Sequence, residues 1–273
     1  MIITTAETVI ERIGAAIGNG EDLRTLAKKA AHDLGEINRE EIGAVIAAAF
    51  SKELRFPSLA VEIAAELGLQ PQTAAIDLDM ACSAYPYAVY LAGKLCTDFG
   101  KKAIVIDGDV QSRLVDKTDH ATGAIFSDAV TASLVSVNSG GQSPNSGGQS
   151  RWSFLSRDDE ALTCPGTGPI RMDGMKVFSF VATEVSKMLK EFLATAGEID
   201  VFAPHQANPY MVRQLAKSLG LSDRLIVLPE EMKNPGSASI ALALKYNAVK
   251  GRRALIAGFG AGYSAAVGTV YVL

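Results

Sequence analysis

The chain of 273 residues has little of several residue types on which particular protein classes depend. Its three cysteines, Cys82, Cys96 and Cys164, are too few and too irregularly spaced for a disulfide framework, and they form no CxxC pair for zinc. This pattern favours a reducing, cytoplasmic location and predicts no metal site. The net charge of −4 provides no overall basic field that would hold a polyanion. A nucleic-acid-binding function is therefore disfavoured.

The first residues also lack the features of a targeting or membrane segment. Glu7, Glu11 and Arg12 interrupt the apolar residues there, so the segment has neither a continuous apolar core nor a span of about 20 apolar residues. We expect no membrane association. What the chain does have is 48% hydrophobic residues and 25 glycines, which is typical of a soluble globular protein with a large core and many tight turns.

Hydrophobic periodicity predicts alternating strands and helices. Helical spacing over residues 5–35 predicts two helices separated by Gly18-Asn19-Gly20. The clearest unit runs from a strand at 73–79 through a helix at 84–99, closed by Gly100, to a strand at 102–107, and this order is a βαβ unit. Further strands are expected at 42–50, 200–203, 253–257 and 264–272, and further helices at 58–67, 173–194, 209–219 and 237–247. The sequence therefore predicts an α/β protein in which strands and helices alternate in both halves.

A low-complexity tract, NSGGQSPNSGGQS, occupies residues 138–150. It holds no hydrophobic residue that would offset the entropy of ordering it, so we expect a flexible loop. It divides the chain into an N-terminal half, 1–137, and a C-terminal half, 151–273.

Three residues are candidates for chemistry. Cys82 falls between a strand and the first turn of a helix, where the helix dipole would lower a thiol pKa, although a small buried cysteine is an equal alternative. His205 follows an apolar strand, where a side chain can project into a cavity, or it lies in a surface turn. Asn234 precedes Pro-Gly, which makes a turn unaided.

A glycine-rich segment, Gly258-Phe259-Gly260-Ala261-Gly262-Tyr263, lies between two expected strands. A strand pattern follows it, so a dinucleotide-binding motif is not supported. Closely spaced glycines allow backbone amides to approach a substrate, as in an oxyanion hole; a simple hairpin turn is the alternative.

Cys, His and Asn in this chain order occur in papain-like proteases and in thiolase-fold ketosynthases. The residues around Cys82 do not fit the protease signature. The motifs that fit the second arrangement are Phe56-Pro57-Ser58, Asp77 to Ala84, Gly108-Asp109, Phe126 to Ala129, His205-Gln206-Ala207-Asn208, Asn234 with Ser237-Ala238-Ser239, and Phe259 to Tyr263. From about residue 21 onward the chain resembles the β-ketoacyl-acyl-carrier-protein synthase III family.

The resemblance implies a thiolase-like α/β fold in which two similar βαβ-rich halves stack in five layers. It implies a decarboxylating Claisen condensation in fatty-acid-like biosynthesis, with Cys82, His205 and Asn234 as the catalytic residues and the amides of Cys82 and Ala261 as the oxyanion hole. Phe56, Asn208, Gly260 and Gly262 are the expected substrate-binding residues. The implied substrates are a primer on coenzyme A or a carrier protein and malonyl-acyl-carrier-protein, with no metal or redox cofactor. The implied assembly is a homodimer.

The chain departs from the family's usual pattern in its first 20 residues, where the stretch that binds coenzyme A is not recognisable. We therefore expect a shortened N-terminus. The source of the primer therefore stays open. Two other functions stay open as well: acyl transfer without decarboxylation, and a role as partner subunit of a heterodimeric ketosynthase.

Overall fold

The computed structural model describes residues 1–116, 118–138, 148–166 and 168–273. Within these ranges nine strands form one mixed sheet in the order β3-β2-β4-β5-β1-β6-β11-β10-β9. These strands are β1 (Ile3–Ile17), β2 (Ile42–Ala48), β3 (Ala74–Leu78), β4 (Lys102–Asp109), β5 (Ala129–Asn138), β6 (Gln149–Leu155), β9 (Val201–Pro204), β10 (Arg252–Gly260) and β11 (Ser264–Val272). A separate pair is formed by β7 (Leu162–Thr163) and β8 (Arg171–Met172).

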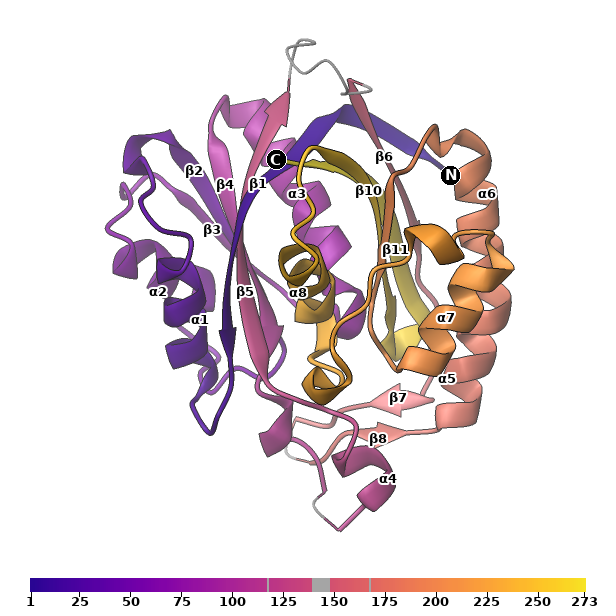
Figure 1. Cartoon of the computed structure of the whole chain (residues 1–273). Helices are drawn as coiled ribbons and strands as arrows, with labels where there is room; N and C mark the ends of the chain where they lie inside the picture. Colours follow the sequence, from indigo (N-terminus) through magenta and orange to yellow (C-terminus); the bar gives the residue numbers. More distant parts are fainter. Residues whose placement is uncertain (117, 139–147, 167) are drawn as a thin grey trace.

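Apart from α4, which lies beyond one end of the sheet, the helices form three layers on and between the two halves of the sheet (Figure 1). They are α1 (Leu23–His32), α2 (Leu59–Glu66), α3 (Ala84–Phe99), α4 (His120–Gly123), α5 (Gly174–Phe180), α6 (Ser186–Ala196), α7 (Pro209–Ser218) and α8 (Ser239–Tyr246). One buried cluster joins α1 and α2 to the first half of the sheet, and another joins α5, α6 and α7 to the second half. A third cluster encloses α3 and α8 between the two halves. The order α-β-α-β-α agrees with the five predicted layers.

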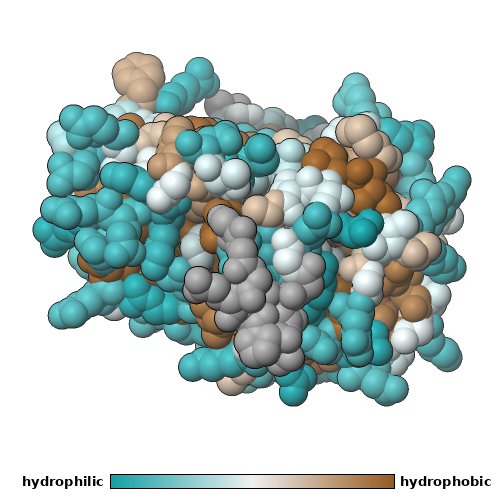
Figure 2. Space-filling model, turned by 90° about the horizontal axis from the view of Figure 1, so that it is seen from above, coloured by the Kyte–Doolittle hydropathy of each residue, from teal (hydrophilic) through white to brown (hydrophobic). Residues whose placement is uncertain are grey.

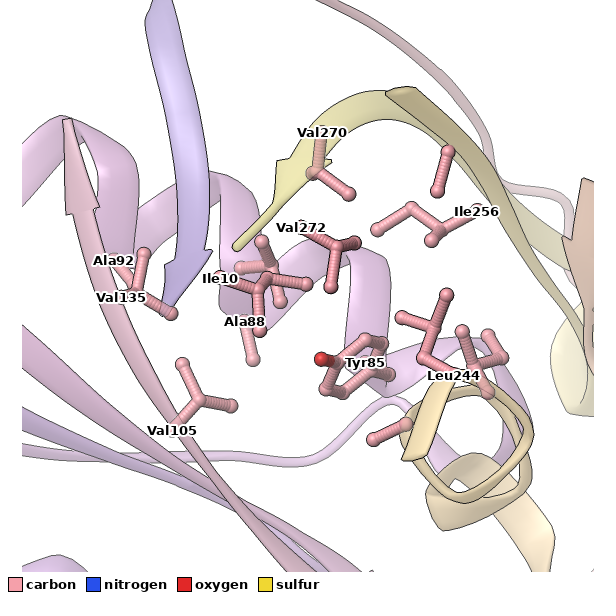
Figure 3. Packing of buried hydrophobic residues seen from close by; sticks show 14 of the residues in the cluster. Ile10, Tyr85, Ala88, Ala92, Val105, Val135, Leu244, Ile256, Val270 and Val272 are labelled. Carbon is pink, nitrogen blue, oxygen red and sulfur yellow. The ribbon is translucent and has the colours of Figure 1, made fainter. Parts of the chain in front are cut away.

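The central cluster is built mainly from small and branched side chains (Figure 3). Ala88 and Ala92 of α3 face Val105 of β4 and Val135 of β5, while Ile256 of β10 packs from the other half. The alanines allow α3 to lie close to both halves of the sheet. On the face seen from above, hydrophilic side chains predominate and hydrophobic ones form separate patches (Figure 2).

Strand β1 joins the two halves of the sheet, and the predicted helix at its position was wrong. Its first residues, Ile3–Ala6, pair with β6, and the rest pairs with β5 from Glu7 to Ile17. Residues 7–10 are all buried. A strand covered on both faces lacks the strict alternation of a half-buried one, and its apolar residues were therefore read at helical spacing.

The other predicted elements are confirmed with small changes. Residues 42–50, whose alanines were ambiguous, form β2. The helix predicted at 173–194 is interrupted by a π-helical turn at Val181–Val185. The ends of the predicted loop 138–150 lie in β5 and in β6, which the sequence did not indicate; residues 139–147 lie outside the described part of the chain.

Candidate active site

Cys82 lies in a single helical turn, η2 (Ala81–Ser83), between β3 and α3. The residue before it, Ala81, has a φ of 43°, a conformation that non-glycine residues rarely adopt. Cys82 is buried, yet it borders a cavity of about 390 Å³ whose apolar lining includes Leu114, Phe126 and Leu162. A strained backbone that holds a cysteine against a cavity is typical of a reactive site.

Of the two alternatives for Cys82, the structure shows the buried cysteine, and its thiol pKa is raised instead of lowered. Burial raises its pKa to about 12, and the carboxyl groups of Asp109 and Asp107 would add to this shift only in their charged forms. Asp109 accepts hydrogen bonds from the amides of Phe50 and Ser51, but burial still raises its pKa to about 7. Burial therefore keeps the resting nucleophile a thiol.

The end of β10 packs directly on the cysteine. A Cβ atom added at Gly260 would lie 2.9 Å from the Cβ of Cys82, so only glycine fits there. The following turn, η8 (Ala261–Tyr263), contacts η2, and Ala261 lines the same cavity. Gly262 has a φ of 65°, which explains a glycine at this position of the turn. Two predicted residues, Gly260 and Ala261, thus lie against Cys82.

His205 follows β9 and is 2% exposed. Its Nδ1 lies 2.9 Å from the hydroxyl oxygen of Ser239, and its ring meets that of Phe259 edge-on with centroids 5.5 Å apart. Burial lowers the pKa of His205 to about 4, opposed only in part by a backbone hydrogen bond with Gly236. The imidazole is therefore neutral at physiological pH.

Asn234 is buried in a segment fixed by backbone hydrogen bonds. Its N–H donates to the carbonyl of Ile125 and its carbonyl accepts from Ser127, in each case at 3.0–3.1 Å. Its side-chain oxygen accepts the N–H of Gly236 at 3.0 Å, as the first residue of a tight turn does. The preceding Lys233 has a φ of 52° and a ψ of −137°, a conformation that suits glycine.

The turn after Asn234 connects the three candidate residues. This turn, η7 (Gly236–Ala238), contacts η2 with Cys82 on one side, and Ser239, the partner of His205, follows it directly. Asn234 lines a second cavity of about 190 Å³, together with Asn208. Phe126, which lines the Cys82 cavity, forms a backbone bridge with Asn234 and thus lies between the two cavities.

The remaining predicted residues have other surroundings. Asn208 caps α7, because its side chain accepts the N–H of Met211 at 2.8 Å. Phe56 is 84% exposed and borders neither of these two cavities. Sequence reasoning attached no role to Ser239, Asp107 or Cys164, which lines the Cys82 cavity; Ser239 stands in a quoted motif, but nothing in the sequence indicates its contact with His205.

Two searches of the described residues gave negative findings. They contain no group of three or more His, Cys, Asp or Glu side chains arranged to hold a metal ion. In the same residues, no helix has both the length and the apolar character needed to span a membrane.

Comparisons with known proteins point to one family. The family model described as 3-oxoacyl-[acyl-carrier-protein (ACP)] synthase III matches residues 76–148, and the one for its C-terminal part matches residues 189–272. The chain is 30% identical to β-ketoacyl-[acyl-carrier-protein] synthase III of Ruegeria pomeroyi, over 85% of this chain and 76% of that protein. It is also 30% identical to the protein of that name in Acholeplasma laidlawii, over 96% of this chain and 88% of the relative.

Solved structures agree on the architecture. A 3-oxoacyl-(acyl-carrier protein) synthase from Burkholderia xenovorans superimposes with a TM-score of 0.89 at 23% identity, covering 100% of this chain and 96% of that one. The synthase III from Pseudomonas aeruginosa gives a TM-score of 0.86 at 22% identity, with 97% and 98% covered. The predicted thiolase-like α/β fold is thereby confirmed.

Proposed function

The chain belongs to the 3-oxoacyl-(acyl-carrier-protein) synthase III family, and we propose that it joins an acyl primer to malonyl-acyl-carrier-protein by decarboxylating Claisen condensation. One observation carries the proposal: the turn between Asn234 and Ser239 contacts the turn that bears Cys82 and supplies the partner of His205. These contacts support a site in which Cys82 is the nucleophile and His205 and Asn234 stabilise an enolate.

In the first half-reaction the sulfur of Cys82 attacks the carbonyl carbon of an acyl thioester. The new C–S bond forms as the old thioester bond breaks, and the thiol proton ends on the departing thiol of the donor. Because the resting thiol is neutral, this proton must leave as the sulfur attacks. The amides of Cys82 and Ala261 are the proposed donors to the tetrahedral oxyanion, since both residues border the cavity.

In the second half-reaction the malonyl thioester loses carbon dioxide. Its C–C bond breaks, and the electron pair becomes an enolate whose oxygen receives hydrogen bonds from His205 and Asn234. A neutral imidazole suits this role, because it donates an N–H without carrying a charge that would have to be buried. The enolate carbon then attacks the acyl-Cys82 carbonyl and releases the sulfur, which regains a proton. The reaction so written needs two thioesters and no metal or redox cofactor.

The carrier protein and a second copy of the chain are the proposed partners. Lys187 and Lys190 on α6 and Arg213 and Lys217 on α7 are exposed on neighbouring helices and offer a basic patch for an acidic carrier. Phe56 supports dimerisation, because an aromatic side chain that is 84% exposed is a candidate for burial by a partner subunit.

We place the enzyme in the cytoplasm, where Cys82 stays reduced. The proposed substrate-binding residues remain Phe56, Asn208, Gly260 and Gly262.

The proposal is tested in two steps. The protein is mixed with acyl-CoA or acyl-carrier-protein, and the intact mass is searched for an acyl adduct that disappears in Cys82→Ala and persists in Cys164→Ser, whose cysteine borders the same cavity. Malonyl-acyl-carrier-protein is then added and carbon dioxide is measured. An adduct without carbon dioxide release would favour simple acyl transfer, and a protein that acylates only with a second, different subunit would favour a heterodimeric role.

A further inference from the structure

Asp107 on β4 is a buried carboxyl group to which the proposed mechanism gives no role. It has no exposed surface, and within the described part of the chain neither of its carboxylate oxygens has a hydrogen-bond partner. Its neighbour on the strand, Asp109, is satisfied by two backbone amides. A carboxyl group that is fully buried and unpartnered is costly, so its presence calls for a physical account.

Strand alternation places Asp107 toward the central helix layer. On β4, Ala103 and Val105 belong to the cluster around α3 and α8, whereas Ile104 and Ile106 belong to the outer cluster with α1 and α2. Asp107 continues the inward series. There β4 contacts η7, which also contacts α3 and the turn that bears Cys82. The carboxyl group thus lies beneath the segment that joins the three catalytic candidates.

The polar group that faces Asp107 is the hydroxyl of Ser237. This hydroxyl is also fully buried and without a hydrogen-bond partner among the described residues, and it is the side chain that most favours ionisation of Asp107. Ser237 lies in η7, between Asn234 and Ser239. The two groups can pair in either protonation state, because a carboxylate accepts from the hydroxyl and a carboxylic acid both accepts and donates. Only the protonated form pairs with Ser237 without leaving a charge buried.

The surroundings of Asp107 favour the protonated form. Burial raises its pKa well above the ordinary value, and the nearby charge of Asp109 adds to this. Cys82 and Tyr85 are the other titratable groups whose charge interacts with Asp107, and each would be negative when ionised. In the described part of the chain no ion pair involves Asp107.

We propose that Asp107 is a positioning residue for the condensation: as a neutral carboxylic acid it exchanges hydrogen bonds with Ser237 and fixes the turn between Asn234 and Ser239. The proposal rests on the proposed function, because it concerns the decarboxylation half-reaction. It requires that Asp107 affect Asn234 and His205 while leaving Cys82 acylation almost unchanged.

The test compares Asp107→Asn, Asp107→Ala and Ser237→Ala with the wild type. Asparagine cannot ionise but can donate to Ser237 and accept from it, so Asp107→Asn should keep the rate of carbon dioxide release within about threefold. The other two variants should lose about ten- to hundredfold in kcat for this step, with acylation of Cys82 changed by less than about threefold. Ser133→Ala is the control for loss of a buried hydrogen bond. Ser133 lies on β5, next to β4, and its buried hydroxyl is hydrogen-bonded to the hydroxyl of Tyr85 on α3.

A second readout does not depend on activity. Because the folded pKa of Asp107 is raised, the stability that its neutral form contributes is complete below its unfolded pKa and is lost as the pH rises through the folded value. The unfolding midpoint of Asp107→Asn should therefore rise relative to that of the wild type as the pH increases from about 5 to about 8.5. Ser237→Ala supplies the kinetic test if Asp107→Ala fails to fold.

Each outcome of these tests either supports or overturns the proposal. The proposal is overturned if Asp107→Asn loses as much activity as Asp107→Ala, if Ser237→Ala is unaffected, if both half-reactions fall in parallel, or if the difference in midpoint is independent of pH. If the wild type releases no carbon dioxide, the proposed function has failed, and the pH dependence of the midpoint still decides whether Asp107 is held neutral.

Discussion

The Nδ1 atom of His205 lies 2.9 Å from the hydroxyl oxygen of Ser239, and the same oxygen accepts the N–H of Gln206 at 3.1 Å. A hydroxyl has one proton and two lone pairs, so Ser239, after accepting from Gln206, either donates to Nδ1 or accepts from it. In both cases this hydrogen bond fixes the orientation of the imidazole ring. Ser239 therefore positions His205.

Replacing Ser239 should separate the two half-reactions. Ser239→Ala removes the hydrogen bond that holds Nδ1 and lets the ring reorient, so we expect carbon dioxide release to fall by about tenfold or more. Acylation of Cys82, which does not use His205 in the proposed mechanism, should be nearly unchanged when followed by intact mass. Ser186→Ala, which removes a buried hydroxyl bonded to Ser218, is the control. A parallel loss of acylation in Ser239→Ala would contradict a role of Ser239 that is confined to the second half-reaction.

The pH dependence of the second half-reaction should report the lowered pKa of His205. Because the imidazole stays neutral down to about pH 4, the rate of decarboxylation by the acylated enzyme should show no loss around pH 6.5. The measurement is carbon dioxide release from pre-acylated protein across the acid range. A midpoint near 6.5 that is absent in His205→Asn would show that the ring is more hydrated than its burial indicates.

The same shift makes a prediction about stability. The folded pKa of His205 is lower than its unfolded pKa, so the stability contributed by the neutral ring is complete above pH 6.5 and is lost as the pH falls to about 4. The loss is on the order of 3 kcal/mol for a shift of this size. Urea unfolding at about pH 7 and about pH 4.5 should show a larger loss in the wild type than in His205→Asn, since the carboxylates of both proteins titrate alike.

Gly260 should be intolerant of a methyl group. The added Cβ of Gly260→Ala would lie 2.9 Å from the Cβ of Cys82, which forces the nucleophile to move. We expect the rate of acylation to fall by about ten- to hundredfold, since displacements below about 1 Å are costly at a reacting centre. Gly166→Ala is the matched control, because Gly166 lines the cavity that Cys82 borders and its added Cβ would meet no atom within 4 Å. Equal rates in the two variants would argue against Cys82 as the nucleophile.

The sequence predicted those parts of the fold in which local pattern and final environment agree. The unit around Cys82 was predicted well, because the strand, the helix and Gly100 each carry a local signal. Strand β1 was not, since it is covered on both faces and its pairing with β5 is set by contacts more than 110 residues away. Helical spacing of apolar residues was the only pattern left to read there.

The candidate site was predictable in its residue types but not in its electrostatics. Cys82, His205 and Asn234 stand in recognisable motifs, and the fold brings their segments together. The pKa values of Cys82 and His205 depend on how deeply the layers bury them, and a sequence does not give that depth. The contact between β4, which carries Asp107, and the turn with Ser237 joins segments about 130 residues apart, so no local pattern indicates it.

Lys233 occupies a backbone conformation in which a side chain is strained, and its replacement should stabilise the protein. A residue other than glycine with a φ of 52° and a ψ of −137° costs about 1 kcal/mol or more, which Lys233→Gly would relieve. Part of this gain is offset by the greater freedom of glycine in the unfolded chain. The expected net result is an increase of about 0.5–1 kcal/mol in the free energy of unfolding. Lys217→Gly, on the exposed face of α7 where the backbone is helical, should instead lose about 1 kcal/mol. Urea titrations of both variants give the comparison, and a loss of stability in Lys233→Gly as large as that in Lys217→Gly would show that the Lys233 side chain, rather than its backbone, determines the turn before Asn234.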